Sequence, residues 1–327
     1  MYTNSDERLS IPGVPVHKMR LGFHKIYTEG LHPDVRFPRH RYLEVEKAIK
    51  LRGGDQIIDF YPPPPATFQE MCLAHCQSYI KRFLSHQLTT KERREIGLRP
   101  WTKDIVERTK ILTGGTIAAA EFAVQSNGYA ANMAGGTHHA YHERGSGYCI
   151  VNDIAIAVYH LRNHFNIKRI AIIDLDVHQG DGTAAIFQNE DWVYTLSIHG
   201  QKNFPFRKQQ SSLDIGLPNE TKDQPYLQAV ARGIRSAMAF APECVFFQGG
   251  VDPLIDDKLG KLHVSREGLI ERNKMVFDAV DSLQIPCVVL MGGGYANPIG
   301  PTVQALCDLF LGAAERHHQR QIASHQG

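Results

Sequence analysis

Five polar clusters, each placed directly after a short apolar run, contain the residue types that carry out metal and acid–base chemistry. They are Gly135-Gly136-Thr137-His138-His139, the octapeptide DLDVHQGD at 174–181, Ser197-Ile198-His199, GGVDP at 249–253 and GGGY at 292–295. One such cluster would be ordinary turn chemistry, because glycine and aspartate are common where a strand stops. Their coincidence on strands of one sheet predicts a site at a shared edge.

Asp176 and His178 are the first candidate metal ligands, since alternate residues of an extended chain point to the same side. Asp252 is the candidate third ligand. Two carboxylates and one imidazole leave a fourth position open for water, as in catalytic zinc sites. Iron(II) or cobalt fit the same ligands. The alternative, a turn with capping aspartates, is weakened by the second aspartate cluster and the paired histidines.

The tandem histidines His138 and His139 are candidates for acid–base catalysis, and each needs a partner that fixes its tautomer. Asp174 and Asp181 flank the ligand pair and can each accept an imidazole N–H. Two such pairs beside a metal-bound water predict a general base and a general acid.

Tyr295 follows a triple-glycine turn, where glycine permits positive φ and close backbone approach. Its hydroxyl is therefore a candidate donor to a developing oxyanion, and the chemistry implied is amide hydrolysis. The alternative is a tyrosine whose ring packs in a wall while its oxygen meets solvent.

Alternating strand and helix patterns position these clusters. Residues with helical spacing lie between the strand-like runs, for example Ile154, Val158 and Leu161 after the possible caps Asn152 and Asp153. Further helical patterns cover 227–238 and 269–280, and the strand-like runs are 128–133, 169–174, 193–198, 244–247 and 287–291. The alternation predicts an α/β fold with an open, mostly parallel sheet and helices on both faces.

Composition sets the remaining expectations. With 327 residues, 43% hydrophobic content and a net charge of +2, the chain is predicted to form one catalytic domain over 1–327, with a core of about 15–313 and a polar, solvated or frayed C-terminal tail. The sequence has no stripe of basic residues that would predict direct nucleic-acid binding, and it has no apolar run long enough to predict a membrane span. The N-terminal decapeptide lacks the basic segment followed by an apolar one that marks a secretory signal. We therefore expect an intracellular protein, located in the cytoplasm or, if the source is a eukaryote, in the cytoplasm or the nucleus.

The blocks GGTHHA, DLDVHQGDGT, GGVDPL and MGGGY resemble the signatures of the zinc-dependent histone deacetylase family, which has the arginase/deacetylase fold. The resemblance extends from about Leu31 to Leu311. The segments RPWTKDIVERT, SGYCIVNDIAIA and SSLDIGLP are most similar to the class IV branch and its bacterial relatives.

The resemblance implies zinc on Asp176, His178 and Asp252. It also implies acid–base roles for His138 paired with Asp174 and for His139 paired with Asp181. Tyr295 would polarise the carbonyl group of the substrate. Gly147 and Tyr148 would line a tunnel for the acyl-lysine, and Arg36 would lie at the inner end of this tunnel. For Arg36 an ordinary surface charge is the alternative. A structural potassium ion is implied at Asp174, Leu175, Asp176, His178, Ser197 and Ile198.

The expected function is hydrolysis of an acyl-lysine amide in a protein or peptide, with at least one acyl group longer than acetyl preferred, as class IV resemblance suggests. An acetylpolyamine or other small-amide hydrolase is the alternative within the family. An arginase-like ureohydrolase would need two manganese ions and a DxDxxDP segment, and an inactive acyl-lysine binder would have lost Tyr295 or a histidine; neither pattern is present. The loop 89–101 offers no obvious acidic residue to grip a substrate backbone, and Trp101 is interpreted as a packing anchor.

Overall fold

The computed structural model describes residues 17–326, with side chains to 324, and contains one eight-stranded sheet in which every pair of strands is parallel. The strand order is β2-β1-β3-β8-β7-β4-β5-β6. The strands are β1 Met19–Gly22, β2 Ile58–Tyr61, β3 Tyr129–Asn132, β4 Ile170–Asp174, β5 Val193–Gly200, β6 Leu213–Leu217, β7 Cys244–Gln248 and β8 Cys287–Leu290. The predicted α/β fold with a parallel sheet is confirmed.

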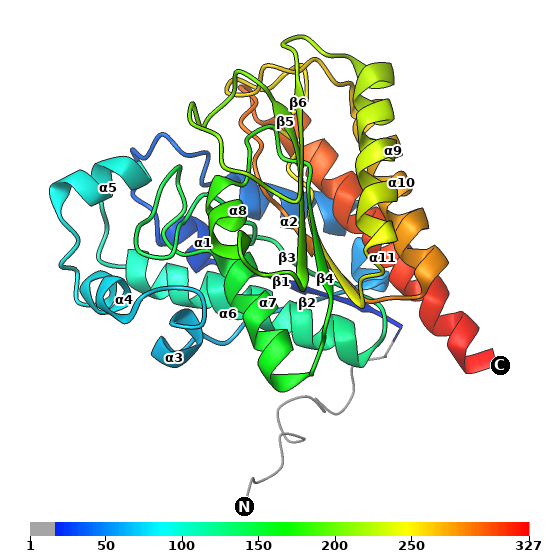
Figure 1. The fold of residues 1–327 in the computed structure, drawn as a ribbon, viewed down its shortest axis with the longest axis horizontal. Helices are drawn as coiled ribbons and strands as arrows, with labels where there is room; N and C mark the ends of the chain where they lie inside the picture. Colours follow the sequence, from blue (N-terminus) through cyan, green and yellow to red (C-terminus); the bar gives the residue numbers. More distant parts are fainter. Residues whose placement is uncertain (1–16, 327) are drawn as a thin grey trace, which may run out of the picture.

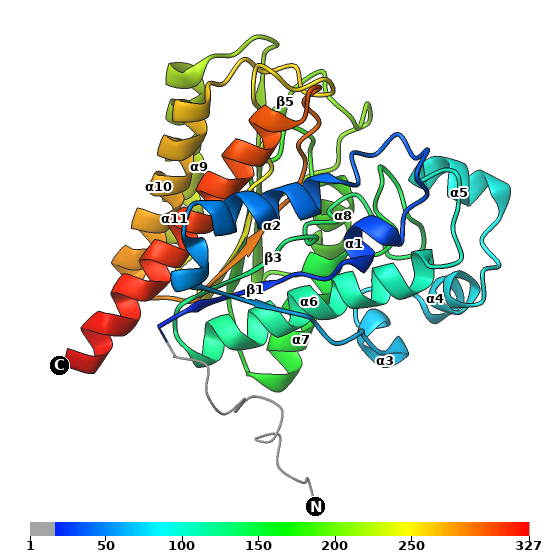
Figure 2. The same ribbon diagram turned by 180° about the vertical axis from the view of Figure 1, so that it is seen from behind.

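Helices cover both faces of the sheet (Figures 1 and 2). On one face α6 packs on β1, β3 and β8 with α7 beside it, and on the other α9, α10, α11 and α2 form a second layer. The helices are α1 Ile26–Glu29, α2 Arg41–Leu51, α3 Phe68–Met71, α4 Gln77–Leu84, α5 Thr90–Ile96, α6 Ile105–Gln125, α7 Asp153–His164, α8 Asp181–Phe187, α9 Asp223–Ala239, α10 Arg266–Leu283 and α11 Gly300–Gln326, with a short 3₁₀ turn at Gly54–Gln56.

The central strands are the ones that sequence patterns predict best. Every residue of β4, β7 and β8 is buried, and their sequences IAIID, CVFFQ and CVVL are nearly continuous apolar runs. Such runs are typical of parallel strands that are covered on both faces. β1, β2 and β6 were not expected, because Arg20, Asp59 and Asp214 interrupt their apolar pattern.

Strand register brings the polar clusters to one edge. Asp174 at the end of β4 lies opposite Ser197 of β5 and Gln248 of β7, and Gln248 lies opposite Leu290 of β8. Leu290 in turn lies opposite Asn132 at the end of β3. The residues that follow these positions must therefore emerge side by side at the carboxyl edge of the sheet.

The C-terminal segment differs from its prediction. A solvated or frayed end was expected after 313, but α11 continues to Gln326 and buries His317 and Gln321. The Nδ1 atom of His317 accepts the N–H of Tyr129 at 3.1 Å, which explains how a polar side chain occupies the core. The N-terminal decapeptide and residues 15 and 16 of the expected core lie outside the described residues.

Within 17–326, none of the helices combines the length and the apolar character that crossing a membrane requires.

Helix α6 touches the proline-rich loop before α3 so closely that only glycine fits at Gly114. A Cβ atom there would lie 1.8 Å from the carbonyl oxygen of Pro64. We therefore expect Gly114→Ala to lower the free energy of unfolding by roughly 2 to 4 kcal/mol, although alanine favours helices by about 1 kcal/mol. Gly300→Ala in α11 is the matched control, because its Cβ meets nothing within 4 Å. Urea unfolding measures both; equal stability of the two variants would contradict this packing.

Candidate metal centre and active site

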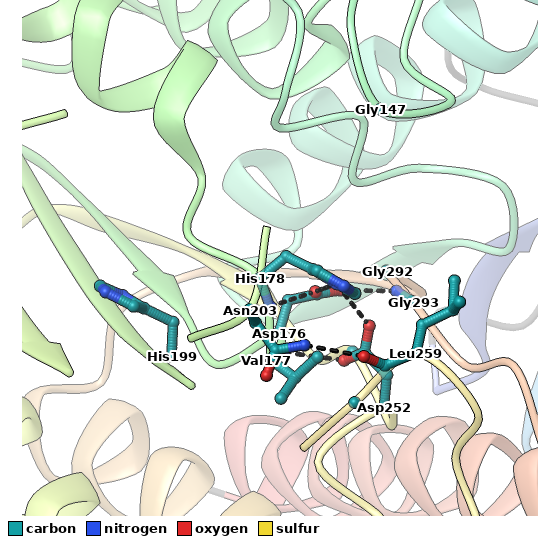
Figure 3. Close-up of polar contacts among 12 residues, drawn as sticks. Gly147, Asp176, Val177, His178, His199, Asn203, Asp252, Leu259, Gly292 and Gly293 are labelled. Atoms are coloured by element: carbon teal, nitrogen blue, oxygen red, sulfur yellow. Dashed lines mark hydrogen bonds and ion pairs between the residues drawn. The ribbon is translucent and has the colours of Figure 1, made fainter. Parts of the chain in front are cut away.

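Asp176, His178 and Asp252 form one buried cluster at the carboxyl edge of the sheet, and each offers a ligand atom within 4.8 Å of the others. The Nδ1 atom of His178 lies 3.0 Å from Oδ1 of Asp176 and 3.1 Å from Oδ2 of Asp252. Figure 3 shows the imidazole and the two carboxylates facing one another. The sequence prediction thus named three residues that the fold brings together.

Backbone N–H groups from two segments, one after β4 and one after β8, hold the carboxylates in place. Asp176 accepts the N–H of Gly293 at 2.7 Å, and Asp252 accepts the N–H of Val177 at 2.8 Å. A Cβ at Gly293 would lie 2.0 Å from Oδ2 of Asp252, so only glycine permits this approach. Gly292 has φ of 61°, the left-handed conformation that the triple-glycine turn was expected to need.

The donor set and its charge fit a divalent cation. Burial, together with repulsion from the neighbouring Asp176, raises the pKa of Asp252 to about 7. Burial lowers the pKa of His178, but the same two carboxylates raise it to about 10, so this group of side chains favours a positive charge among them, which a bound divalent cation would supply in place of the proton. Two oxygens and one nitrogen match catalytic zinc sites, in which the remaining position stays open.

Two histidine–aspartate pairs adjoin this cluster as predicted from the sequence. The Nδ1 atom of His138 lies 2.6 Å from Oδ2 of Asp174, and that of His139 lies 2.6 Å from Oδ1 of Asp181. The two imidazole centroids are 4.1 Å apart. Each aspartate fixes one ring nitrogen and leaves the other available to the pocket.

The two imidazoles have different electrostatic surroundings. Burial lowers the pKa of both; for His138 the carboxylates of Asp174 and Asp176 outweigh burial and raise the pKa to about 9. For His139, burial and the neighbouring His138 lower the pKa to about 4. A cation between the three ligands would oppose the charge on His138. The surroundings therefore favour a neutral His139.

Tyr295 contributes a phenol to the same buried pocket. The pocket is lined by both catalytic candidates and ligands, among them His138, His139, Asp176, His178 and Tyr295. Burial raises the pKa of the Tyr295 hydroxyl well above its usual value, so this group stays protonated and can donate. Its backbone N–H donates to Oδ2 of Asp257 at 2.6 Å, which fixes the segment after the glycine turn.

Gly147 and Tyr148 line both the inner pocket and its mouth, where they meet Phe204. The Phe204 ring lies 4.9 Å from the His139 ring, edge to face. This placement agrees with the tunnel expected from the resemblance. The mouth also includes Glu95 of α5, although sequence reasoning found no obvious acidic residue in the loop 89–101.

Arg36 does not lie at the inner end of the tunnel, where the resemblance implied an arginine. It is exposed and lines a surface hollow beside the tunnel opening, whereas the buried Arg41 lines both this hollow and the inner pocket. The Arg41 guanidinium donates to the carbonyl oxygens of Gly292 at 3.0 Å and Gly294 at 3.1 Å. Arg41 is the first residue of α2, which turns its side chain inward. Arg41 was not considered from the sequence, because local pattern does not show which arginine of the segment HPDVRFPRHRY turns inward.

The potassium set implied by the resemblance stays a prediction. The carbonyl of Leu175, one of its members, accepts an N–H of Arg272 at 3.4 Å. Asp174, the last residue of β4, lies opposite Ser197 in the middle of β5. Ile198 follows within β5, and the Ser197 hydroxyl lies 3.0 Å from Nδ1 of His199.

Several residues at the site were missed because only tertiary contacts reveal them. The Tyr141 hydroxyl donates to Oδ2 of Asp181 at 2.8 Å and so orients the partner of His139. Arg272 is fully buried and donates to the carbonyls of Gly250 at 2.6 Å and Gly249 at 3.1 Å, just before Asp252. Trp101 is half-buried against the core, which agrees with its packing role.

Comparison with known proteins gives concordant matches. The profile of the histone deacetylase domain matches residues 36–307. An uncharacterised protein of Picosynechococcus is 39% identical over 278 residues, which cover 85% of this chain and 92% of the relative. Histone deacetylase 2 of Arabidopsis thaliana is 29% identical, covering 86% and 76%, and human histone deacetylase 1 is 30% identical, covering 78% and 56%. The chain belongs to the histone deacetylase family.

Proposed function

We propose that the protein hydrolyses the acyl-lysine amide of a protein or peptide in a zinc-dependent reaction. The observation that carries this proposal is one buried pocket lined by two of the candidate ligands, both histidines and the phenol. The third candidate ligand, Asp252, lies against His178, and Asp174 and Asp181 each lie against one of the histidines. Asp176, His178 and Asp252 would hold the metal. Zinc bound by such ligands supplies a Lewis acid that lowers the pKa of water from about 15.7 to about 7.

Other residues of the chain position the substrate, polarise its carbonyl group and transfer the proton. Tyr148 and Phe204 flank the lysine stem and exclude water, and Tyr295 donates its hydroxyl to the carbonyl oxygen. The neutral His139, held through Nδ1 by Asp181, accepts a proton from the attacking water through its other nitrogen. The imidazolium then gives this proton to the leaving amine, while Asp174 keeps His138 oriented beside it.

We also propose the structural potassium ion that the resemblance implies, held by Asp174, Leu175, Asp176, His178, Ser197 and Ile198. The two carboxylates supply the negative charge that such a cation needs.

Other activities have less support. A ureohydrolase needs a second metal, and one group of three ligands is found among residues 17–326. An inactive binder would lack part of the machinery, whereas this chain has Tyr295 and both histidines in the lining of one pocket, which supports an enzyme. A small-amide hydrolase uses the same machinery, so substrate assays must separate it from a peptide deacylase.

The metal assignment predicts the behaviour of Asp252→Ala. Removal of one anionic ligand should leave zinc content well below stoichiometric and abolish turnover, because two ligands hold zinc weakly. Asp256→Ala, which removes an exposed carboxylate nearby, is the control and should keep both its zinc content and its turnover. Mass spectrometry measures the zinc content, and circular dichroism checks separately that the variant is folded. Stoichiometric zinc with near-normal turnover in Asp252→Ala would show that Asp252 is not a ligand.

The role of the phenol predicts the kinetics of Tyr295→Phe. The ring remains while the donor is lost, so kcat should fall roughly 10²- to 10³-fold with little change in KM. Steady-state kinetics on one acylated peptide measure both constants. A loss of only twofold would refute the assignment.

The inner pocket predicts a preference for acyl length, in line with a class IV-like enzyme. Leu98, Leu112 and Phe37 line it, and each buried methylene contributes about 0.8 kcal/mol. At least one acyl group longer than acetyl should therefore give the higher kcat/KM. The measurement compares acetyl, butyryl, octanoyl and myristoyl versions of one peptide. A steady fall from acetyl onward would contradict this preference and leave a plain deacetylase.

A further inference from the structure

Two surface hollows flank the opening of the proposed acyl-lysine tunnel. Both are bordered by Tyr148, Leu259 and Tyr295, so the opening lies between them. One hollow continues over the loop that carries Phe204, and the other continues over the segment that precedes α2. A peptide bound by its acylated lysine must lie across both.

Positive charge gathers at these hollows. Apart from the buried Arg41, their lining contains five lysine or arginine residues and only two carboxylates: Lys202, Lys261, Arg36, Arg39 and Lys258 against Glu44 and Glu95. In the described part of the chain none of these five cations forms an ion pair, and the partners of Lys261 and Arg39 are backbone carbonyls. The whole chain carries 36 basic and 34 acidic residues, so this excess is local.

The cationic rim is attached to the segment that carries the phenol. The Lys208 amine donates to the carbonyls of Asn203 and Pro205 at 2.6 Å each, and the Asn203 amide donates to the Leu259 carbonyl at 2.8 Å. Figure 3 shows Asn203 and Leu259 next to the ligand cluster. Asp257 accepts the N–H groups of both Leu259 and Tyr295. The backbone that carries Lys202 and Lys258 is therefore held at a fixed place beside the tunnel.

Phe206 adds an apolar surface to the same rim. Its side chain is 91% exposed, although it lines the hollow beside the tunnel. A bound peptide would cover this ring, which gives the rim affinity for a polypeptide rather than for a small amide alone.

We propose that this mouth selects acyl-lysines flanked by acidic residues and disfavours acetylpolyamines and segments rich in lysine and arginine. The inference rests on the proposed acyl-lysine hydrolysis and names the substrate class for it. Fixed cations within a Debye length of about 8 to 10 Å attract carboxylates and repel amines at physiological ionic strength.

The test compares two peptides with the same acyl-lysine, one flanked by aspartate and glutamate and the other by lysine and arginine. At low salt we expect kcat/KM to favour the acidic peptide by about fivefold or more, mainly through KM, and this ratio to shrink at 0.5 M salt. Lys202→Glu combined with Lys258→Glu reverses two exposed charges on opposite sides of the opening and should invert the preference. Lys168→Glu is the control, because Lys168 is exposed before β4, at the opposite edge of the sheet.

The outcomes separate the two proposals. Equal hydrolysis of both peptides by the zinc-loaded enzyme, or a preference unchanged in the double variant, overturns the charge selection while lysine deacylation stands. Failure to hydrolyse either peptide overturns the proposed function. In that event the binding affinities of the same two peptides, fluorescently labelled, still decide the charge preference: tighter binding of the acidic peptide supports it, and equal binding refutes it.

Discussion

The architecture of this site depends on two carboxylates that are buried against one imidazole. Asp176 and Asp252 are almost inaccessible to solvent, yet both lie in contact with His178. Negative charge in such a place is costly unless hydrogen bonds and a cation compensate it. The backbone N–H groups of Gly293 and Val177 supply the hydrogen bonds, so the loops after three strands must meet at this point.

Two buried arginines keep those loops in shape without touching the carboxylates. Arg41 donates to the glycine turn after β8, and Arg272 donates to the glycine pair after β7. Carbonyl oxygens that would otherwise lack partners in the interior are satisfied in this way. The same loops bring Tyr295 into the pocket that His138 and His139 line, so the contacts that stabilise the buried carboxylates also assemble the groups of the proposed reaction.

The sequence predicted what depends on local pattern. The strands β4, β7 and β8 were evident because burial on both faces demands continuous apolar runs, and the ligand cluster was evident because polar residues follow those runs. Strand β1 was not evident: its Arg20 is buried, and the guanidinium lies 5.1 Å from the centre of the Phe122 ring, a contact that the sequence cannot show. That Arg41 lies at the inner pocket likewise depends on how α2 packs in the fold, and the buried His317 accepts the backbone N–H of Tyr129.

The central claim is that Asp176, His178 and Asp252 together bind one divalent cation, which compensates the charge of the two buried carboxylates. The direct measurement is anomalous X-ray scattering at the zinc edge from crystals of the protein supplied with one equivalent of zinc. The account predicts a single peak about 2.0 to 2.2 Å from one oxygen of each aspartate and from one imidazole nitrogen. Zinc bound elsewhere, or no peak between these three side chains, would contradict it.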